Sequence, residues 1–487
     1  MNADYDDDII IGGGKAGKTL APALVTAGRK TALVERSLTM IGGTCINVAC
    51  IPTKTMVASA KVANVVRTSA AYGVNNNAPI VDLAAVIQRK RSVVQSMRQM
   101  NLHNLETALG HELIIGSANF VAPKTIEVTT AEGTTRFLAA ERFFINTGTR
   151  PLIPAIPGLT RFLAAERFFI NTGTRPLIPA IPGLQETGFL TSESIMELEQ
   201  LPEHLIVLGS GYIGLEFAQM FRRFGSRVTV IGQSEQILSQ QDPDMAIAVQ
   251  SLLERDGIEF LLNAKVLRVD RVDNLTQLQI QVADGEIKLQ SSHLLVAVGR
   301  APTTDTLNLA AAGVATDERG FIPVSDRLET NVPNIWALGD INGGAQFTHA
   351  SLDDYRIVKA NLIDGGNRST RGRLIPSCLF IDPELAHIGL TETEARQQGY
   401  AIRVAKLDVS AIPRARTLGQ TDGVMKAIVE TETGHILGCS LFCHEAGEAI
   451  STVQMVMQAQ MPYTVLRDSI LTHPTMTEGL NLLFSKF

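Results

Sequence analysis

The chain has 487 residues, of which 45% are hydrophobic and 19% charged, a composition that excludes a disordered protein and allows about three domains. The net charge of −6 argues against nucleic acid or an anionic membrane as a main partner. The acidic start (MNADYDDD) has no signal-peptide pattern, no apolar run reaches the length of about 18 residues that spans a bilayer, and five cysteines are too few for a secreted disulfide framework, so we expect a cytoplasmic protein.

The first expected elements are a buried strand at residues 8–11, a glycine loop, a helix and a second strand at residues 31–34. The loop glycines are Gly12, Gly14 and Gly17. Glu35 closes the second strand at about the expected distance from them. This is the βαβ dinucleotide fingerprint, in which the glycines let the backbone approach a pyrophosphate at a helix N-terminus and the acid binds a ribose.

The same loop also fits a second nucleotide motif. Residues 12–19 (GGGKAGKT) match the P-loop pattern, which would give Lys18 and Thr19 phosphate and magnesium roles in a nucleotide triphosphatase. The acid at Glu35, a second dinucleotide fingerprint and the cysteines that follow favour the dinucleotide interpretation.

Residues 42–54 (GGTCINVACIPTK) place Cys45 and Cys50 four residues apart, which is not the spacing of a zinc site, and we expect no resident metal. On an ideal helix their Cα atoms would lie roughly 8–9 Å apart, whereas a disulfide needs about 4.4–6.8 Å. A bridge would therefore distort the first helical turn and be easily reduced. Lys54 and the helix N-terminus both favour a thiolate. We interpret the pair as redox-active rather than as two unpaired buried cysteines.

Residues 135–159 recur without a difference as residues 160–184 (TRFLAAERFFINTGTRPLIPAIPGL). Each copy predicts a strand followed by a Thr-Gly turn, at Gly148 in the first copy and at Gly173 in the second. A fold that uses this segment once is expected to leave the other copy as a surface insertion. The residues themselves do not decide which copy takes the native position.

A second fingerprint begins with an expected strand at residues 205–208 and ends with one at residues 227–231. Its glycines are Gly209, Gly211 and Gly214. The second strand is followed by Gly232 instead of an acid, which favours NADP mildly because an acid there would repel a ribose 2′-phosphate. Two such units predict two nucleotide-binding domains.

Two later strands end in residues suited to cofactor binding. Residues 294–298 precede Gly299 and Arg300, and residues 334–339 precede Asp340. Ligands of open α/β sheets bind beyond the carboxyl ends of strands, so Asp340 is a candidate for binding a cofactor hydroxyl, the alternative being a simple turn.

From Arg373 onward the pattern changes to alternating strands and amphipathic helices, which predicts a separate α+β domain. Cys439 and Cys443 lie in an apolar strand and are expected in its core. Near the end, His473 and Glu478 form a candidate acid–base pair, because a carboxylate at one ring nitrogen fixes the tautomer of the other. A surface pair without function is the alternative.

Together these motifs, residues 42–54 above all, resemble the class I pyridine nucleotide–disulfide oxidoreductases, the family of glutathione reductase, dihydrolipoamide dehydrogenase and mercuric reductase. The resemblance runs from Ile9 to Phe484. Residues 14–20, 348–356 and 411–416 are most similar to a member implicated in the reduction of copper(II). Removal of one duplicated copy would leave a chain of the usual family size.

The resemblance implies an α/β fold with two Rossmann-like dinucleotide-binding domains, for FAD and NAD(P), and a C-terminal α+β dimerisation domain. The expected boundaries are residues 1–184 and 304–372 for the FAD domain, 185–303 for the NAD(P) domain and 373–487 for the dimerisation domain. The expected acceptor is a small molecule, a disulfide or a metal ion.

The resemblance also implies residue roles. Cys50 would lie next to the flavin and Cys45 would face the substrate, with His473 and Glu478 supplied by the partner subunit of a homodimer. Lys54 would sit beside the flavin N5 and pair with Glu216. The expected cofactor-binding residues for FAD are Gly12, Gly14, Gly17, Glu35, Thr44, Lys54, Gly148, Gly173 and Asp340. The other expected cofactor-binding residues are Gly209, Gly211, Gly214, Gly299, Arg300 and Tyr212, the last as a gate of the nicotinamide pocket.

We therefore expect an enzyme that passes electrons from NADPH or NADH through FAD to the Cys45–Cys50 disulfide and then to an acceptor. Mercury(II) is a weaker candidate, because the chain lacks the C-terminal cysteine pair of mercuric reductases. One alternative is a dihydrolipoamide dehydrogenase, which usually keeps the acid that Gly232 replaces. Another is a flavin-free dimeric protein disabled by the duplication.

Overall fold

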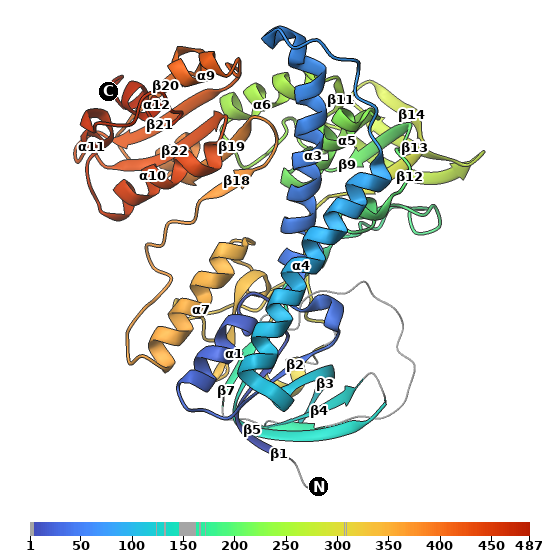
Figure 1. The fold of residues 1–487 in the computed structure, drawn as a ribbon, viewed down its shortest axis with the longest axis vertical. Helices are drawn as coiled ribbons and strands as arrows, with labels where there is room; N and C mark the ends of the chain where they lie inside the picture. The colour runs from blue at the N-terminus through green and yellow to red at the C-terminus, as the bar shows by residue number, and fades with distance from the viewer. Residues whose placement is uncertain are drawn as a thin grey trace. The chain divides into compact units, whose positions relative to one another are not determined.

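The computed structural model describes residues 4–122, 124–130, 133–145, 162–164, 167–170, 172–305, 307 and 309–487 (Figure 1). The chain divides into two units. Unit 1 comprises Met1–Thr55, Gln88–Leu177 and Arg300–Arg373, and unit 2 comprises Met56–Ile87, Ile178–Gly299 and Leu374–Phe487. Within the ranges described, no helix combines the length and the apolar character that a membrane span requires.

Unit 1 is built on a sheet with the strand order β17-β7-β5-β1-β2-β3-β4-β6. Its strands are β1 (Asp4–Ile11), β2 (Thr31–Glu35), β3 (Leu113–Ala122), β4 (Lys124–Thr130), β5 (Thr135–Ile145), β6 (Phe162–Ala164), β7 (Arg167–Ile170) and β17 (Ile335–Ala337). Strands β17, β7, β5, β1 and β2 are parallel neighbours. Their carboxyl ends, which precede Gly12 and Asp340 and include Glu35, therefore lie on one edge of the sheet.

The apolar run at the end of β1 is explained by burial on both faces of this sheet. Ile9 and Ile11 pack on one face, together with residues of β2, β4 and β17. Ile10 packs on the other face with side chains of α1 (Gly17–Thr26) and α7 (Thr348–Leu362). The two helices thus cover the face of the sheet on which Ile10 packs.

Both copies of the duplicated segment contribute strands to this sheet, so the expected surface insertion of one copy is wrong. The first copy forms β5, which pairs with β1 and β4, and the second forms β7, which lies between β5 and β17. The copies pair in register, Arg142 opposite Arg167 and Phe143 opposite Phe168. Chain connectivity explains the result. The first copy follows β4 directly and can pair with β4 and β1. The second copy comes next in the chain, before β8, and can pair with β5 and β17.

The remaining elements of unit 1 include a short antiparallel ladder of β8 (Thr174–Pro176) with β16 (Arg300–Pro302). The short helix α2 spans Gly43–Asn47. Helices α3 (Cys50–Thr68) and α4 (Leu83–Leu109) contribute residues to both units.

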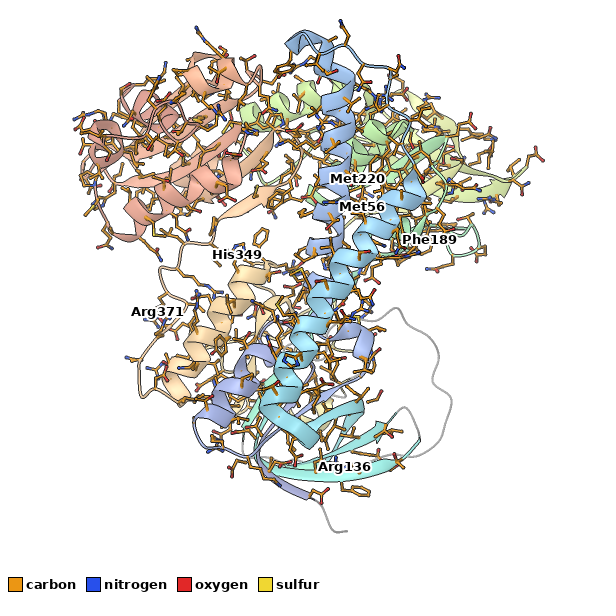
Figure 2. The ribbon with its side chains drawn as sticks, viewed as in Figure 1. Met56, Arg136, Phe189, Met220, His349 and Arg371 are labelled. Carbon is orange, nitrogen blue, oxygen red and sulfur yellow. The ribbon has the colours of Figure 1, made fainter. Side chains whose placement is uncertain are left out.

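Unit 2 contains a second parallel sheet, with the order β11-β10-β9-β15. Its elements are β9 (His204–Leu208), α5 (Tyr212–Phe224), β10 (Arg227–Ile231), α6 (Pro243–Arg255), β11 (Ile258–Leu261) and β15 (His293–Val296), joined by the antiparallel strands β12 (Lys265–Val272), β13 (Leu275–Val282) and β14 (Gly285–Ser291). Met56 and Met220 belong to one buried cluster of this unit (Figure 2). The predicted strands at residues 205–208 and 227–231 are confirmed.

The C-terminal part of unit 2 is an antiparallel sheet with the order β18-β19-β22-β21-β20. Its elements are β18 (Ser377–Leu379), β19 (Glu384–Gly389), α8 (Glu392–Gln397), β20 (Ile402–Asp408), α9 (Pro413–Thr417), β21 (Val424–Glu430), β22 (Ile436–Cys443), α10 (Ala446–Gln458), α11 (Thr464–Asp468) and α12 (Gly479–Phe484). Cys439 and Cys443 are fully buried on β22, as predicted. This antiparallel sheet with its flanking helices is the predicted α+β domain.

Candidate functional site

The first glycine loop connects β1 to α1 and is held against the end of β2. The backbone N–H of Gly12 donates to the carbonyl of Val34 at 2.6 Å, and Gly12 has a φ of 107°, which glycine adopts readily. Glu35 is buried and accepts the backbone N–H of Gly13 at 2.7 Å. Burial raises the pKa of Glu35. A carboxylate at the end of β2, beside an open glycine loop, is the arrangement that binds a ribose hydroxyl.

A Cβ atom added to Gly43 would lie only 2.7 Å from the Cα atom of Gly14. The start of α2 therefore packs directly on the glycine loop, and Gly43 permits this contact. Thr44 and Cys45 follow Gly43 on α2, so the helix that carries the first cysteine begins in direct contact with the predicted nucleotide site.

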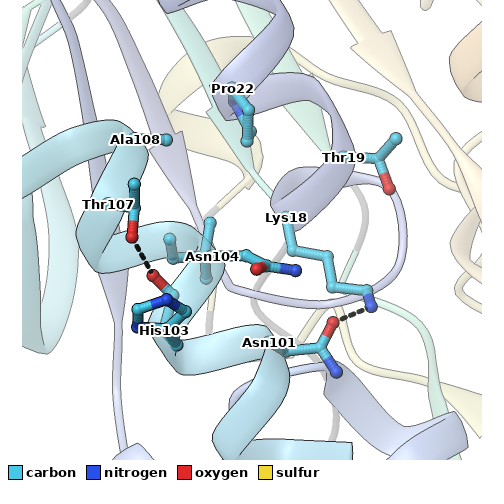
Figure 3. A pocket seen from close by; sticks show the side chains of 9 residues that line it. Lys18, Thr19, Pro22, Asn101, His103, Asn104, Thr107 and Ala108 are labelled. Atoms are coloured by element: carbon cyan, nitrogen blue, oxygen red, sulfur yellow. Dashed lines mark hydrogen bonds between the residues drawn. The ribbon is translucent and has the colours of Figure 1, made fainter.

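The P-loop alternative fails on the positions of its two polar side chains. The Lys18 amine donates to Asn101 Oδ1 on α4, and the Thr19 hydroxyl donates to the carbonyl of Lys15 at 2.7 Å (Figure 3). Both side chains line a cavity of about 580 Å³ between α1 and α4. Both side chains thus lie on the side of α1 that faces α4, and neither takes the phosphate or magnesium role that the P-loop pattern would give it.

Cys45 and Cys50 meet at a break between two helices. α2 ends at Asn47, α3 begins at Cys50, and the backbone N–H groups of Val48 and Ala49 both donate to Thr44. The spacing predicted a distortion of this turn for a disulfide-bridged pair, whereas the structure has the break with both cysteines as free thiols. The two cysteines are half-buried thiols whose side chains hydrogen-bond each other.

The two thiols have opposite acidities. The hydrogen bond from Cys45 lowers the pKa of Cys50 to about 6, with further help from Thr348 and from the positive charge of Lys54. The same hydrogen bond, together with burial, raises the pKa of Cys45. In the reduced pair, Cys50 therefore carries the negative charge and Cys45 holds the proton.

Three residues that the sequence analysis did not identify hold this pair in place. Asn47 donates from Nδ2 to the carbonyls of Ile41 and Gly43, both at 2.9 Å. Arg98 on α4 donates from Nε to Asn47 Oδ1 at 2.8 Å. The Thr348 hydroxyl oxygen lies 3.4 Å from the Cys50 sulfur. The contacts of Arg98 and Thr348 join residues 51 and 298 positions apart, so no local sequence pattern marks them, whereas Asn47 contacts carbonyls only six and four residues away.

Asp340 lies in the single helical turn after β17 and is half-buried. Thr174 donates its hydroxyl to Asp340 Oδ2 at 3.1 Å, and Arg300 donates from Nε to the same Thr174 hydroxyl at 2.6 Å. Burial raises the pKa of Asp340, and the nearby Arg300 charge opposes that rise. The predicted residues Asp340 and Arg300 are thus joined through Thr174.

The Thr-Gly turn of the second copy is described, and Gly173 has a φ of 67°. Gly148, its equivalent in the first copy, lies outside the described residues. The buried Thr172 hydroxyl has no hydrogen-bond partner among the residues that the structure describes. The buried Thr172 hydroxyl, the Glu35 carboxylate at the end of β2 and the first glycine loop are groups that a dinucleotide such as FAD would engage.

The three glycines of the second glycine loop have different surroundings. A Cβ atom on Gly209 would lie 2.3 Å from the carbonyl oxygen of Ala297, and one on Gly214 would lie 2.0 Å from that of Gly209. A Cβ atom on Gly211 would meet nothing within 4 Å. Gly209 and Gly214 therefore permit close packing, while Gly211 leaves open space where a pyrophosphate would lie.

Gly232 follows β10, where a ribose-binding acid would stand. A Cβ atom there would lie 2.8 Å from Ser210 Oγ and 2.9 Å from Leu262 Cδ2. A larger side chain at this position would therefore require these two side chains to shift.

Tyr212 is the first residue of α5, and its hydroxyl lies 3.3 Å from Ser377 Oγ and 3.4 Å from Gln241 Nε2. Burial raises the pKa of Tyr212. Glu216, one turn further along α5, is buried and accepts the backbone N–H of Phe380 at 3.0 Å. Lys54 belongs to unit 1 and Glu216 to unit 2, so their pairing stays a prediction. Gly299 has a φ of 135° and precedes β16.

His473 and Glu478 come together as predicted, with Nδ1 of His473 2.8 Å from Oε2 of Glu478. The His473 side chain is 68% exposed and that of Glu478 is 12% exposed. The pair is therefore formed within one chain, with its imidazole presented on the surface of the C-terminal domain.

Comparison with known proteins gives two family matches. Residues 6–354 match the model for pyridine nucleotide-disulphide oxidoreductases, and residues 375–483 match that family's dimerisation domain. The probable pyridine nucleotide-disulfide oxidoreductase RclA of Escherichia coli strain K12 is 42% identical over 98% of this chain and 98% of its own length. A mercuric reductase of Bacillus cereus is 33% identical over 100% of this chain and 72% of its own.

The structural comparison agrees. The solved Cu(II) complex of the HOCl-induced flavoprotein disulfide reductase RclA from Escherichia coli superposes with a TM-score of 0.86 at 41% identity, covering 100% of both chains. The predicted α/β fold, with its two dinucleotide-binding domains and C-terminal dimerisation domain, is confirmed.

Proposed function

Because the chain belongs to the pyridine nucleotide-disulphide oxidoreductase family, we propose that it transfers electrons from NAD(P)H through FAD and the Cys45–Cys50 pair to a small acceptor. The observation that carries this proposal is the position of Cys45 and Cys50 on either side of the break between α2 and α3, with the start of α2 packed on the first glycine loop. A pair with one thiolate and one thiol is the reduced form that a redox-active disulfide needs for directional exchange.

Glu35, Asp340 and the first glycine loop would hold FAD, with Lys54 placed on α3 close to the Cys50 sulfur. When bound, FAD would accept a hydride from the nicotinamide and supply two electrons to the disulfide. Uptake of those electrons breaks the sulfur–sulfur bond. Cys50 is left as a thiolate, and one proton from solvent makes Cys45 a thiol.

Cys45 would then deliver electrons to the acceptor. With a disulfide acceptor, Cys45 loses its proton and attacks one sulfur, and Cys50 then attacks Cys45 and releases the second thiol. With Cu(II), two ions would take one electron each as the cysteine pair closes to a disulfide and the Cys45 proton leaves. His473 of the partner subunit would accept that proton, as the resemblance implies.

We propose Cu(II) or a small disulfide as the acceptor, because a solved structure that is 41% identical to this chain is a Cu(II) complex of a disulfide reductase. We further propose NADPH as the preferred donor. The glycine at position 232 supports it, because no acid there can bind a free ribose hydroxyl or repel a 2′-phosphate.

The dimerisation-domain match supports a homodimer. Exposed apolar side chains in this domain, among them Ile470, Met461 and Leu482, agree with a surface that a second copy covers. In such a dimer, the exposed His473 of each chain could reach the cysteine pair of its partner.

The test is an absorption spectrum of the purified full chain, followed by a steady-state screen with NADPH and NADH. The screen uses Cu(II), Hg(II), lipoamide, glutathione disulfide and quinones as acceptors. We expect a flavin spectrum and NADPH-dependent reduction of Cu(II) or a disulfide. Preferred reduction of lipoamide with NADH would indicate a dihydrolipoamide dehydrogenase instead. A colourless protein that binds no added FAD would contradict the proposal.

A further inference from the structure

Lys426 is a buried lysine at the centre of a set of charged side chains in unit 2. It lies on β21 in the C-terminal domain and is 2% exposed. Its amine lies 3.0 Å from carboxylate oxygens of Asp242 and Asp244 and 2.9 Å from one of Glu392. Burial acts to lower the pKa of Lys426, but the three carboxylates outweigh burial and raise that pKa. Lys426 is therefore a charged group held inside the protein, and the proposed electron transfer makes no use of it.

Asp242 directs its carboxylate at the C-terminal domain rather than at its own helix. It stands at the start of α6, where an aspartate usually accepts a backbone N–H of the helix that it begins. Its side chain instead accepts the backbone N–H groups of Glu392 and Thr393, at 2.9 and 3.1 Å, where α8 begins (Figure 1). We call these contacts and the ion pair with Lys426 the Asp242 joint. The joint fixes one end of residues 232–241, which connect β10 to α6.

This connection from β10 to α6 runs along the second glycine loop. It begins at Gly232, close to the side chain of Ser210 in that loop. In its middle, Leu238 donates its backbone N–H to the carbonyl of Ser210 at 3.1 Å. At its end, Gln241 donates from Nε2 to the hydroxyl of Tyr212 at 3.4 Å. The connection thus contacts both the glycine loop and the first residue of α5, and it would line a dinucleotide bound there.

We propose that Lys426 is a positioning residue that fixes this connection through Asp242 and so keeps the NADPH site in its binding shape. The role in cofactor binding rests on the proposed function. Release of the joint would free one end of the connection, so that ordering it would become part of the cost of binding the cofactor. An ion pair that only stabilises the fold, the alternative, would lower the thermal midpoint when broken and leave the affinity for the cofactor unchanged.

The test uses two variants of the joint and one control. Lys426→Met removes the buried charge and keeps much of the side-chain volume. Asp242→Asn is the milder change, because the amide keeps an oxygen for the N–H groups of α8. The control is Lys406→Met, since Lys406 lies opposite Lys426 on β20, is 51% exposed and contacts Asp244.

Each full-length protein is studied below the onset of its thermal unfolding. Calorimetric titration with NADP⁺ gives the Kd without any hydride transfer. Hydrogen exchange followed by peptide mass spectrometry measures the protection of residues 232–241, with the peptide that covers β9 as the internal reference.

In Lys426→Met and Asp242→Asn we expect the Kd for NADP⁺ to rise about fivefold or more and the amides of residues 232–241 to exchange faster, with Lys406→Met like the parent protein. Faster exchange with an unchanged Kd would make the joint a stabilising contact only and overturn the proposal, as would unchanged exchange in both variants. An equal rise of the Kd in Lys406→Met would also overturn it. The exchange measurement needs no cofactor. A parent protein that binds neither NADP⁺ nor NAD⁺ would contradict the proposed function, and the exchange of residues 232–241 would then decide whether Lys426 positions the connection.

Discussion

Nδ1 of His473 lies 2.8 Å from Oε2 of Glu478, five residues further along the chain. The carboxylate side chain is 12% exposed and the imidazole 68% exposed, so a mostly covered carboxylate holds an accessible imidazole. Oε1 of Glu478 is buried and has no hydrogen-bond partner in the described part of the chain. The arrangement fixes the ring tautomer and leaves Nε2 to exchange a proton with a second molecule.

The first prediction concerns this pair. Glu478→Gln should slow the step in which the cysteine pair reduces the acceptor by about 10- to 100-fold, because a neutral amide no longer stabilises the protonated imidazole. The rate of flavin reduction by NADPH should not change. Stopped-flow measurement of the two half-reactions separates the effects, and Glu432→Gln, in an exposed turn of the same domain, is the control. Unchanged acceptor reduction in Glu478→Gln would remove the pair from the mechanism.

A second prediction separates binding from packing in the second glycine loop. Gly211→Ala should leave the thermal midpoint unchanged, because the added methyl group meets no atom within 4 Å, yet raise the KM for NADPH by about tenfold or more by filling the expected pyrophosphate position. Gly214→Ala should lower the thermal midpoint instead, because its methyl group would lie 2.0 Å from the Gly209 carbonyl oxygen. The same response to both substitutions would argue against this division of roles.

A third prediction follows from the two copies in one sheet. Strand β7 adds one strand spacing, about 4.8 Å, between β1 and β17 and hence between the Gly12 loop and Asp340. Excision of residues 160–184 should close this gap and tighten FAD binding by about tenfold or more, as measured by flavin fluorescence on the apoprotein. Because the copies are identical, excision of either one produces the same protein. Equal FAD affinity before and after excision would contradict the prediction.

A cross-link tests the sheet arrangement independently of FAD. Arg142 and Arg167 pair on adjacent strands, so Arg142→Cys with Arg167→Cys should form a disulfide on mild oxidation. Failure of this pair to cross-link, in a protein that folds, would show that the two copies do not lie side by side.

A fourth prediction uses the buried acid of β1. Asp6 is 1% exposed, its Oδ1 lies 3.0 Å from the Lys30 amine, and burial raises its pKa to about 6. Because the pKa of Asp6 is raised in the folded protein, the protonated carboxyl group favours the fold. This contribution is complete below the ordinary pKa of 3.8 and is lost as the pH rises through about 6. Asp6→Asn should therefore raise the free energy of unfolding of unit 1 by about 1–3 kcal/mol above about pH 7, with no gain near pH 3.

Urea denaturation at the two pH values measures this difference. Asp4→Asn, at an exposed position two residues earlier on the same strand, should change the stability by less than about 0.5 kcal/mol at either pH. A pH-independent effect of Asp6→Asn would mean that the carboxyl group does not titrate as its burial implies.

The parts of the fold that sequence predicted best are those with local signals. The strand at residues 227–231 was predicted at its exact bounds, and the glycines of both loops lie where parallel strands end. Helix geometry predicted a distorted turn between Cys45 and Cys50 for a bridged pair, and the structure shows a break there with the two thiols free. His473 and Glu478 are close in sequence, so their pairing was also within reach of a local argument.

The parts that sequence missed depend on residues far apart. Thr348 and Cys50 are 298 residues apart, and only the packing of α7 against the sheet brings them together. The side chains that a larger residue at position 232 would meet belong to Ser210 and Leu262, and no local sequence pattern connects these residues to Gly232. The duplicated segment was expected to compete for one place, but strands with identical pairing edges extend the sheet because β1 and β17 each accept one copy.

The central claim, that electrons reach the acceptor through the cysteine pair, is tested most directly with Cys45→Ser in a stopped-flow experiment. NADPH is mixed anaerobically with the flavin-loaded variant, and the acceptor is added in a second mixing step. We predict that NADPH reduces the flavin at the rate of the parent protein while reduction of the acceptor, Cu(II) or a small disulfide, is lost. Reduction of that acceptor at the parent rate by Cys45→Ser would contradict the account.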